Sequence, residues 1–460
     1  MNITNLGGYS VDPDILIDHI GIIHVVWSYR IDDNFWKIMY SCSDDDGETW
    51  SEPLDLLQNT DLWMSEPHID CDSENHLYVT YTHNTMNIYE MFIKMVIYDG
   101  YEWSDPILVS EGMPGSDYNK VLVDYNNRVY VFWGYQNIKI KYRIYENNTF
   151  GEIMEPYYNS LGDYYYLYYN AIDTNNKVHW IGYTTEGMPS GTFAHAYFTL
   201  EPDLNEWSVP QNISIVKAEI GNDIDLSVND FPRVVIREDK THLPARLDDI
   251  TFLLENDGIN WKQPVTISNV AVSQQYQQIA VDQNNDVHIV EIQMPDEGLK
   301  LVHYRKYGNK WIGQIIDTCY IILFTDLIFH DNKLYVVYNK TWPIAPQTFE
   351  SDLFLSKYEI VTNIKEETRQ TTELKIYPNP GSDNIYIEFK NDKQQQIDLS
   401  ILDMNGKHLI TLISETKPQG MYRQLWSGKD KKGKQLSAGQ YLVRVKLGRN
   451  TTTGFVEIIK

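Results

Sequence analysis

The sequence predicts an all-β protein: a seven-bladed β-propeller of four-stranded blades, in which an N-terminal strand closes the last blade, followed by a small Ig-like β-sandwich. Three observations support this fold. Aromatic residues make up 13% of the 460 residues, with 34 Tyr, and aromatic side chains pack well on pleated sheets. A strand pattern recurs along most of the chain. Composition then changes near residue 363.

Each repeat begins with a short apolar strand that ends in a polar turn, usually at an aspartate. A strand of alternating pattern follows, as in Ile69–Asp72 and then Tyr78–Tyr81. A third strand, a turn and a Trp that opens a fourth strand complete the unit; Trp50 is the first such Trp. The pattern occurs seven times at spacings of about 47–55 residues, with apolar strands at residues 15, 69, 121, 170, 225, 279 and 327.

Four strands at this period are typical of a propeller blade, because a lone four-stranded sheet leaves both faces uncovered and radial packing buries them. The seventh repeat ends near Ile360 and lacks the fourth strand. Asn2–Asn5 resembles Val265–Ser268, the outer strand of another repeat. We therefore expect the N-terminal segment to supply the missing strand and to close the ring.

The sequence predicts three regions: the propeller over residues 1–362, a polar linker over 363–373 and the sandwich over 374–460. The first region has 22 Lys and Arg against 53 Asp and Glu, whereas residues 363–460 have 16 against 11. Short alternating strands with turn signals every 8–12 residues, in under 100 residues, are typical of a small β-sandwich.

The C-terminal region carries several ordered motifs. It opens with Tyr377-Pro378-Asn379-Pro380, has an aspartate-to-glycine turn at 403–407 and a late Gly439-Gln440-Tyr441, and ends in Lys460. It closely resembles the type A C-terminal sorting domain of type IX secretion cargo in Bacteroidetes. The resemblance implies that residues 374–460 engage the type IX machinery and that the protein is secreted or on the outer cell surface. Such cargo starts with a signal peptide; none is recognisable in this sequence, so we expect its N-terminus to be truncated or mis-started.

A second motif lies in the first repeat. Ser43, Asp45, Gly47, Thr49 and Trp50 match the Asp-box, Ser-x-Asp-x-Gly-x-Thr-Trp. The propeller therefore resembles the sialidase-like superfamily with its BNR repeats. The expected role of these residues is structural, because Asp45 can accept hydrogen bonds from its own turn and Gly47 permits a positive φ.

Composition excludes several classes. The formal charge of −26 argues against nucleic-acid binding, which needs a basic face. The longest apolar run, around 321–329, is too short and too polar to span a membrane. Cys42, Cys71 and Cys319 are too far apart in sequence to suggest a disulfide framework or a metal site. No cofactor or metal is predicted.

The expected site is the end of the ring where the innermost strands begin. Aligning the repeats on their aspartate turns gives its candidate catalytic residues: His68, Lys120, Tyr169, Arg30, His83, Glu66 and Asp14. The resemblance would place an arginine of a sialidase triad in the first inner strand, yet Ser10 stands there. A true sialidase is therefore not expected, because three arginines bind the substrate carboxylate.

The most direct functional prediction is binding of extracellular carbohydrate, with aromatic rings on sugar faces and polar groups on hydroxyls. The candidate rings are Trp63, Tyr164, Tyr166 and Tyr168. Core packing is an alternative role for them. Two other functions remain open: a glycan-active enzyme, either a polysaccharide lyase or a glycoside hydrolase acting through the mixed acid and base residues, and a protein-binding scaffold.

Overall fold

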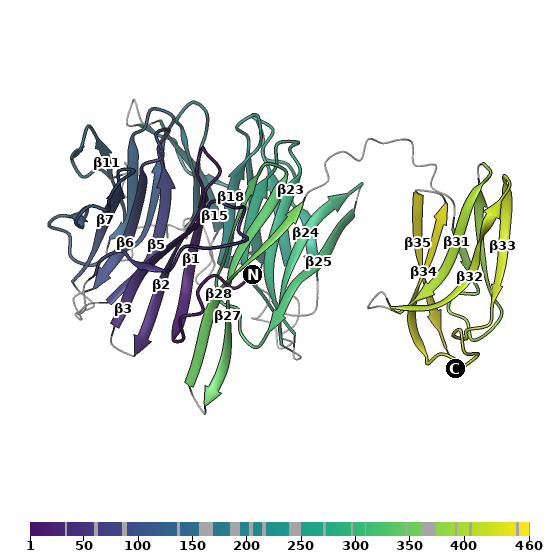
Figure 1. Ribbon diagram of the computed structural model, residues 1–460. Helices are drawn as coiled ribbons and strands as arrows, with labels where there is room; N and C mark the ends of the chain where they lie inside the picture. The colour runs from purple at the N-terminus through teal and green to yellow at the C-terminus, as the bar shows by residue number, and fades with distance from the viewer. Residues whose placement is uncertain are drawn as a thin grey trace, which may run out of the picture. The chain divides into compact units, whose positions relative to one another are not determined.

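The computed structural model divides into two compact units, Met1–Thr362 and Asn363–Lys460 (Figure 1). It describes residues 1–459 except 33–34, 59–62, 85–89, 136–138, 156–168, 185–193, 202–205, 214–217, 239–249, 270–272, 296–297, 309, 346–347, 360–373, 392, 404–406 and 448–449. The expected linker, 363–373, lies outside the described residues. No helix in the described part is long and apolar enough to cross a membrane.

The first unit is built from antiparallel sheets whose innermost strand comes first in sequence. Blade 1 holds β1 (Tyr9–Ile17), β2 (Ile23–Asp32), β3 (Phe35–Ser43) and β4 (Leu54–Asp55); blade 2 holds β5 (Trp63–Cys71), β6 (Leu77–Asn84), β7 (Met91–Tyr98) and β8 (Ile107–Leu108); blade 3 holds β9 (Ser116–Val123), β10 (Val129–Tyr135), β11 (Lys139–Glu146) and β12 (Thr149–Phe150).

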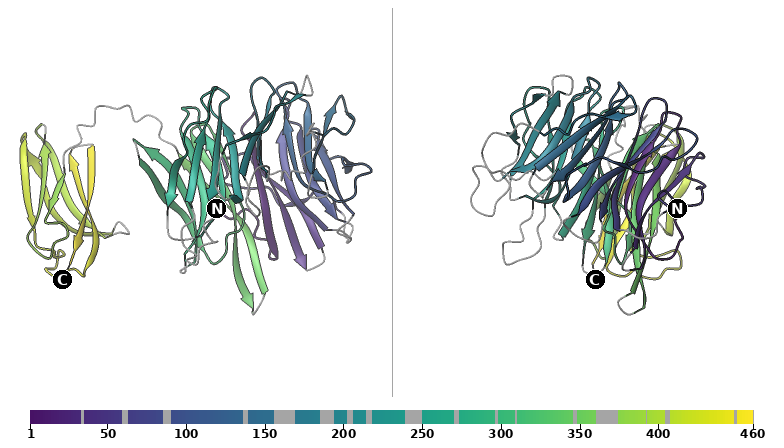
Figure 2. Two further views of the ribbon diagram at one scale, coloured as in Figure 1. Left: turned by 180° about the vertical axis from the view of Figure 1, so that it is seen from behind. Right: turned by 90° about the vertical axis from the view of Figure 1, so that its left-hand side faces the viewer.

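The remaining blades follow the same order along the chain. Blade 4 holds β13 (Tyr169–Ile172), β14 (Val178–Thr184), β15 (Ala194–Glu201), β16 (Glu206–Trp207) and β17 (Gln211–Asn212); blade 5 holds β18 (Ala218–Leu226), β19 (Pro232–Glu238), β20 (Ile250–Glu255) and β21 (Val265–Asn269); blade 6 holds β22 (Ser273–Val281), β23 (Val287–Met294), β24 (Leu299–Tyr307) and β25 (Lys310–Cys319); blade 7 holds β26 (Thr325–His330), β27 (Lys333–Ala345) and β28 (Thr348–Glu359). In Figures 1 and 2 the β27–β28 hairpin extends beyond its neighbours at the end where β2 finishes.

Seven hydrophobic clusters each lie between two neighbouring blades. Trp27 and Val25 of blade 1 pack with Val337 and Leu355 of blade 7, for example. Because blade 7 contacts both blade 6 and blade 1, the sheets form a closed ring. The seven-bladed prediction is confirmed.

The N-terminal segment completes blade 7, as predicted. Asn2 pairs with Phe354 in an antiparallel bridge, the Ile3 N–H donates to the Leu353 carbonyl at 2.7 Å, and the Leu355 N–H donates to the Met1 carbonyl at 2.8 Å. Ile3 is buried. The chain then continues into β1, so one segment links the outer edge of blade 7 to the innermost strand of blade 1.

The turns between inner and second strands explain the recurring aspartate. Oδ1 of each aspartate accepts a hydrogen bond from the backbone N–H four residues later, and this short side chain closes the turn. These aspartates are Asp18, Asp72, Asp124, Asp173 and Asp282. A histidine recurs at one position of the second strand in blades 1, 4 and 6, and its Nε2 lies 3.2–3.6 Å from the turn aspartate. The pairs are His24 with Asp18, His179 with Asp173 and His288 with Asp282. Their role is architectural.

The second unit is a sandwich of two sheets around a common core. One sheet contains β29 (Lys375–Tyr377), β30 (Ile385–Asn391) and β33 (Gly420–Trp426); the other contains β31 (Gln395–Leu402), β32 (His408–Lys417), β34 (Gly439–Leu447) and β35 (Asn450–Ile458). Asn379 fixes the last strand by donating to the Phe455 carbonyl and accepting from the Glu457 N–H, both at 2.8 Å. The predicted sandwich is confirmed.

Candidate functional site

The inner strands of blades 1, 2, 3 and 6 each contain a β-bulge near their first residues, at the end of the ring that we call the mouth. Asp12, Glu66, Tyr118 and Tyr276 occupy the bulge in blades 1, 2, 3 and 6, with φ of +51°, +55°, +50° and +51°. A positive φ is uncommon for non-glycine residues and costs about 1–3 kcal/mol each. Bulges of this kind redirect side chains, and here all four residues line one cavity.

The cavity lies on the ring axis and has a volume of about 660 Å³. Its wall is made by the inner strands of all seven blades, as the repeat alignment predicts. The lining contains seven carboxyl groups and, among the residues described there, one Lys or Arg, which is Lys120. Among all described residues, no cluster of His, Cys, Asp or Glu is arranged to hold a metal ion.

Several of these carboxylates hold neighbouring blades together. Each accepts a backbone N–H from the inner strand of the next blade, which would otherwise be an unpaired sheet edge. The pairs are Asp14 with Ile69, Asp70 with Val123, Asp223 with Ile279, Asp225 with Val281 and Asp326 with Ile15, at 2.6–3.0 Å. The cavity wall is therefore a rigid scaffold.

Three predicted site residues come together in this wall. Asp14 Oδ1 lies 3.1 Å from His68 Nδ1 and 3.2 Å from Lys120 Nζ, and Lys120 Nζ lies 3.2 Å from His68 Nδ1. Asp14 is 7% exposed in its side chain, whereas His68 and Lys120 are 28% and 31% exposed. We call these three residues the mouth triad. A nearly buried carboxylate thus holds two accessible basic groups.

Charge pairing sets the protonation states of the mouth triad. Burial raises the pKa of Asp14, but Lys120 and His68 outweigh it, so the net pKa is lowered and Asp14 stays ionised. Burial and Lys120 lower the pKa of His68 despite the opposing effect of Asp14. Burial lowers the pKa of Lys120, but the negative charges of Asp14 and Asp326 raise it by more than burial lowers it. The net pKa therefore lies above its ordinary value. At neutral pH the imidazole is therefore neutral beside a paired ammonium and carboxylate.

A second group of carboxyl groups, Asp12, Asp117 and Glu66, lies at or next to the bulges, and burial disfavours their ionised form. Burial, and then the charge of Glu66, raise the pKa of Asp12 and of Asp117 to about 7. Burial also raises the pKa of Glu66, against the hydrogen bonds it accepts. Deeper in the cavity, burial and Asp14 raise the pKa of Asp326 to about 7, although Lys120 lowers it. These groups hold protons readily near neutral pH.

Aromatic rings from several blades face the same region. Tyr118, Tyr169, Tyr276 and Phe324 line the cavity, and the Tyr276 and Phe324 ring centroids are 5.6 Å apart. Tyr118 is 37% exposed. Trp63, a predicted glycan-binding ring at the start of β5, is 45% exposed but is not among the residues that line the cavity. Exposed rings beside polar groups are the usual surfaces on which sugar rings stack.

The sequence candidates divide by position. His68, Lys120, Asp14, Glu66 and Tyr169 line the cavity. Two others are not among its lining residues: Arg30 stacks between Tyr9 and Trp36, with its guanidinium 5.0 and 5.3 Å from their ring centroids, and His83 is only 7% exposed. Burial, and then Lys94, lower the pKa of His83 to about 4. Tyr164, Tyr166 and Tyr168 lie outside the described residues.

Asp12, Tyr118 and Tyr276 were not among the predicted site residues. Regular strands would put the mouth positions one or two residues later, whereas the bulge turns the preceding residue into the cavity. A Pro or an amide residue directly follows each of the four bulge residues, including Glu66, and could have indicated the bulge; these followers are Pro13, Pro67, Asn119 and Gln277.

The turn over residues 43–50 has the hydrogen bonds expected of its motif. Ser43 Oγ donates to Asp45 Oδ1, and Thr49 donates through N–H to Oδ1 and through its hydroxyl to Oδ2, at 2.6–2.8 Å. Gly47 has a φ of +80°. This turn follows β3, at the end of the ring opposite the mouth, and contributes nothing to the cavity lining.

Comparison with known proteins separates the two units. Residues 375–459 match the family model of a secretion system C-terminal sorting domain. Among curated proteins, none matches the chain. Among solved structures, a PL25 ulvan lyase bound to -[GlcA(1-4)Rha3S]- has a TM-score of 0.55 and 12% identity, covering 77% of this chain and 94% of that chain.

Two further similar structures have lower scores. An intramolecular trans-sialidase from Ruminococcus gnavus has a TM-score of 0.43 and 10% identity, covering 62% of this chain and 90% of that one. An α-L-arabinanase from Penicillium chrysogenum has a TM-score of 0.44 and 10% identity, with coverages of 64% and 93%. At this identity the lyase likeness establishes the propeller fold alone. The sorting domain makes this a type IX cargo protein, secreted or held on the cell surface.

Proposed function

We propose that the propeller binds extracellular glycan in the mouth cavity. The observation that carries this proposal is a cavity of about 660 Å³ lined by aromatic rings and hydrogen-bonding groups from all seven blades. A sugar needs both, because its ring faces stack on aromatic residues and its hydroxyls need fixed polar partners. The C-terminal sorting domain supports a ligand outside the cell. A lyase that was solved with a bound saccharide has the same fold.

The test is retention on a broad glycan array with matched tyrosine variants. We expect Tyr118→Ala to weaken binding about tenfold, which corresponds to about 1.4 kcal/mol. Tyr101→Ala is the control, because Tyr101 is 93% exposed on the turn before β8, at the opposite end of the ring. Equal loss in both variants, or retention on protein partners with none on glycans, would contradict the proposal and favour a protein-binding scaffold.

The mouth triad favours a second candidate, a glycan-active enzyme. In the tautomer that donates Nδ1–H to Asp14, His68 leaves Nε2 able to accept a proton. Because the pKa of His68 is lowered, its imidazole stays a neutral base to lower pH than a histidine with the ordinary pKa of 6.5. Such a base could remove the proton α to a uronate carboxylate, and Lys120 could stabilise the negative charge that develops on that carboxylate. The bond from the β carbon to the glycosidic oxygen would then break, leaving a double bond in the sugar and a free hydroxyl on the released part.

Incubation of the bound glycan with the protein separates the two candidates. Cleavage would give new reducing ends or unsaturated products that absorb ultraviolet light, and His68→Ala should abolish them while binding persists. Binding with no product from any glycan on the array would exclude the enzyme.

A further inference from the structure

The charges in the mouth cavity limit the kind of sugar that it can hold. Seven carboxyl groups line it: Asp12, Asp14, Glu66, Asp70, Asp223, Asp225 and Asp326. Lys120 is the cation among the described lining residues, and its ammonium is already paired with Asp14 at 3.2 Å. A ligand carboxylate or sulfate entering the cavity would therefore meet mostly like charge, which costs binding energy.

The protonation of the wall points in the same direction. Burial raises the pKa of Asp70 and of Asp225 to about 6. Burial raises the pKa of Asp326 to about 7, with a further contribution from Asp14. These raised pKa values reflect mainly the low solvation of the wall, and the negative charge of Asp14 adds to it at Asp326 and Asp70. A bound cation would stabilise their ionised form, and a bound anion would oppose it.

Unpartnered polar atoms supply an independent observation. Asn119 and Thr325 line the cavity and are 4% and 6% exposed. Asn119 Oδ1 and Thr325 Oγ1 have no hydrogen-bond partner among the described residues. An amide oxygen can only accept a hydrogen bond, so the wall offers an acceptor that lacks a donor. Ammonium and hydroxyl groups are donors, whereas carboxylate and sulfate are not.

We infer that the mouth cavity selects a saccharide carrying amino groups and excludes uronic, sialic and sulfated sugars. This inference rests on the proposed glycan binding and specifies its ligand class. It excludes the elimination described for the second candidate, because that reaction needs a uronate. The ammonium would lie near the bulge carboxyls Asp12 and Glu66, which line the cavity and are partly accessible. Asp12 is hydrogen-bonded to Ser28 of its own blade. Glu66 accepts hydrogen bonds from the Tyr118 N–H of the next blade and from the Thr82 hydroxyl. The specificity would differ from that of the structurally similar lyase, whose bound saccharide contains glucuronate and sulfate.

The experiment measures the affinity of the full chain for three oligosaccharides of equal length by calorimetry at low and high salt. They are a glucosamine oligomer, its N-acetylated form, which keeps the ring but lacks the charge, and a uronic acid oligomer. We expect the amino form to bind about tenfold more tightly than the acetylated form at low salt, and the preference to shrink at high salt. The uronate should not bind.

Variants separate local selection from attraction to the acidic propeller as a whole. Asp12→Asn and Glu66→Gln should each reduce the preference for the amino form by about threefold or more. Glu102→Gln removes the same charge from an exposed turn at the opposite end and should leave the preference unchanged. An equal effect of Glu102→Gln would overturn the inference, as would tighter binding of the uronate or equal binding of the neutral form. Binding to none of the three, nor to any other glycan, would refute the proposed function itself.

Discussion

At the scale of single residues, Asp12 combines two unfavourable features, a φ of +51° and a pKa raised to about 7 by burial and by Glu66. A carboxyl whose pKa is higher folded than unfolded binds more protons in the folded state, so its ionisation reduces stability as pH rises from about 4 to 7. Asp12→Asn removes this effect, and Asn tolerates positive φ. We expect the variant to gain about 1–2 kcal/mol more over wild type at about pH 8 than at about pH 5.

Urea denaturation at the two pH values checks this expectation, with Glu102→Gln as the variant of equal charge change. A stability difference that stayed constant with pH would show that Asp12 ionises normally in the folded state.

Asp14, His68 and Lys120 were predictable because their aspartate turns fix the strand register, and register fixes which residues meet around a propeller axis. Asp12, Tyr118 and Tyr276 were not, because a bulge shifts the alternation locally and strand periodicity contains no sign of it. Arg30 and His83 were wrongly placed in the cavity, since a strand end at the mouth does not guarantee a side chain that lines it.

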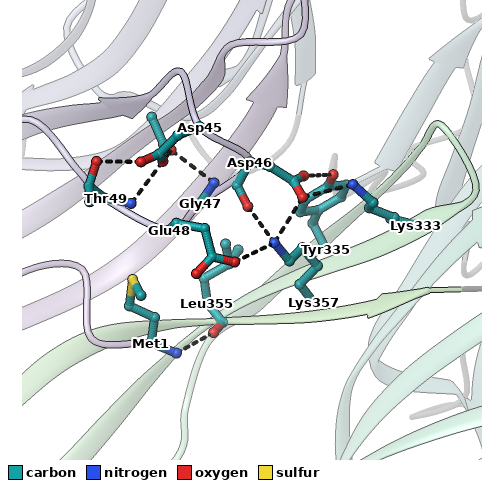
Figure 3. Close-up of polar contacts among 11 residues, drawn as sticks. Met1, Asp45, Asp46, Gly47, Glu48, Thr49, Lys333, Tyr335, Leu355 and Lys357 are labelled. Carbon is teal, nitrogen blue, oxygen red and sulfur yellow. Dashed lines mark hydrogen bonds and ion pairs between the residues drawn. The ribbon is translucent and has the colours of Figure 1, made fainter.

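At the scale of elements, the turn over residues 43–50 of blade 1 also forms hydrogen bonds and ion pairs with blade 7 (Figure 3). Asp46 Oδ2 accepts from Lys333 and Lys357 at 2.7 and 2.8 Å, and its Oδ1 accepts from the Tyr335 hydroxyl. A Cβ on Gly47 would lie 2.6 Å from Leu355 Cδ2. The motif predicted the turn, but no sequence pattern indicated partners almost 300 residues away.

The turn provides a matched pair of variants. Asp46→Ala should lower the free energy of unfolding by about 1–2 kcal/mol, because two ammonium groups and a hydroxyl lose their shared acceptor. Asp44→Ala, at an exposed position of the same turn, should change it by less than about 0.5 kcal/mol. Chemical denaturation measures both; equal values would mean that the cluster does not stabilise the ring.

At the scale of the whole molecule, ring closure was predictable because it follows from counting. The sequence has seven inner strands but lacks the outer strand of the seventh blade. A segment that resembles an outer strand lies at the N-terminus, so the ring closes if this segment fills the missing place. Closure also explains why the cavity is rigid, since the same carboxylates that line it hold successive inner strands. The placement of the bulges depends on tertiary packing and could not be obtained by counting.

Removal of residues 1–5 tests closure. The deletion exposes the outer edge of β28 and removes buried Ile3 and the hydrogen bonds of Thr4 with Asp352 and Leu353. We expect a loss of about 3 kcal/mol or more, from one buried aliphatic side chain and several hydrogen bonds. Leu6→Ala, at an exposed neighbouring position, should have little effect in the same thermal melt. An unchanged melting temperature after the deletion would show that the segment does not close the ring.

The mouth cavity is the proposed glycan-binding site of the propeller. Amide hydrogen exchange with and without a retained glycan tests it most directly, because exchange reports the position of the ligand along the chain. Slower exchange should be confined to the first residues of β1, β5 and β9, around Asp12, Glu66 and Tyr118. Protection at the turns of residues 43–50 and 99–105, with these strands unchanged, would place the ligand at the opposite end and contradict the account.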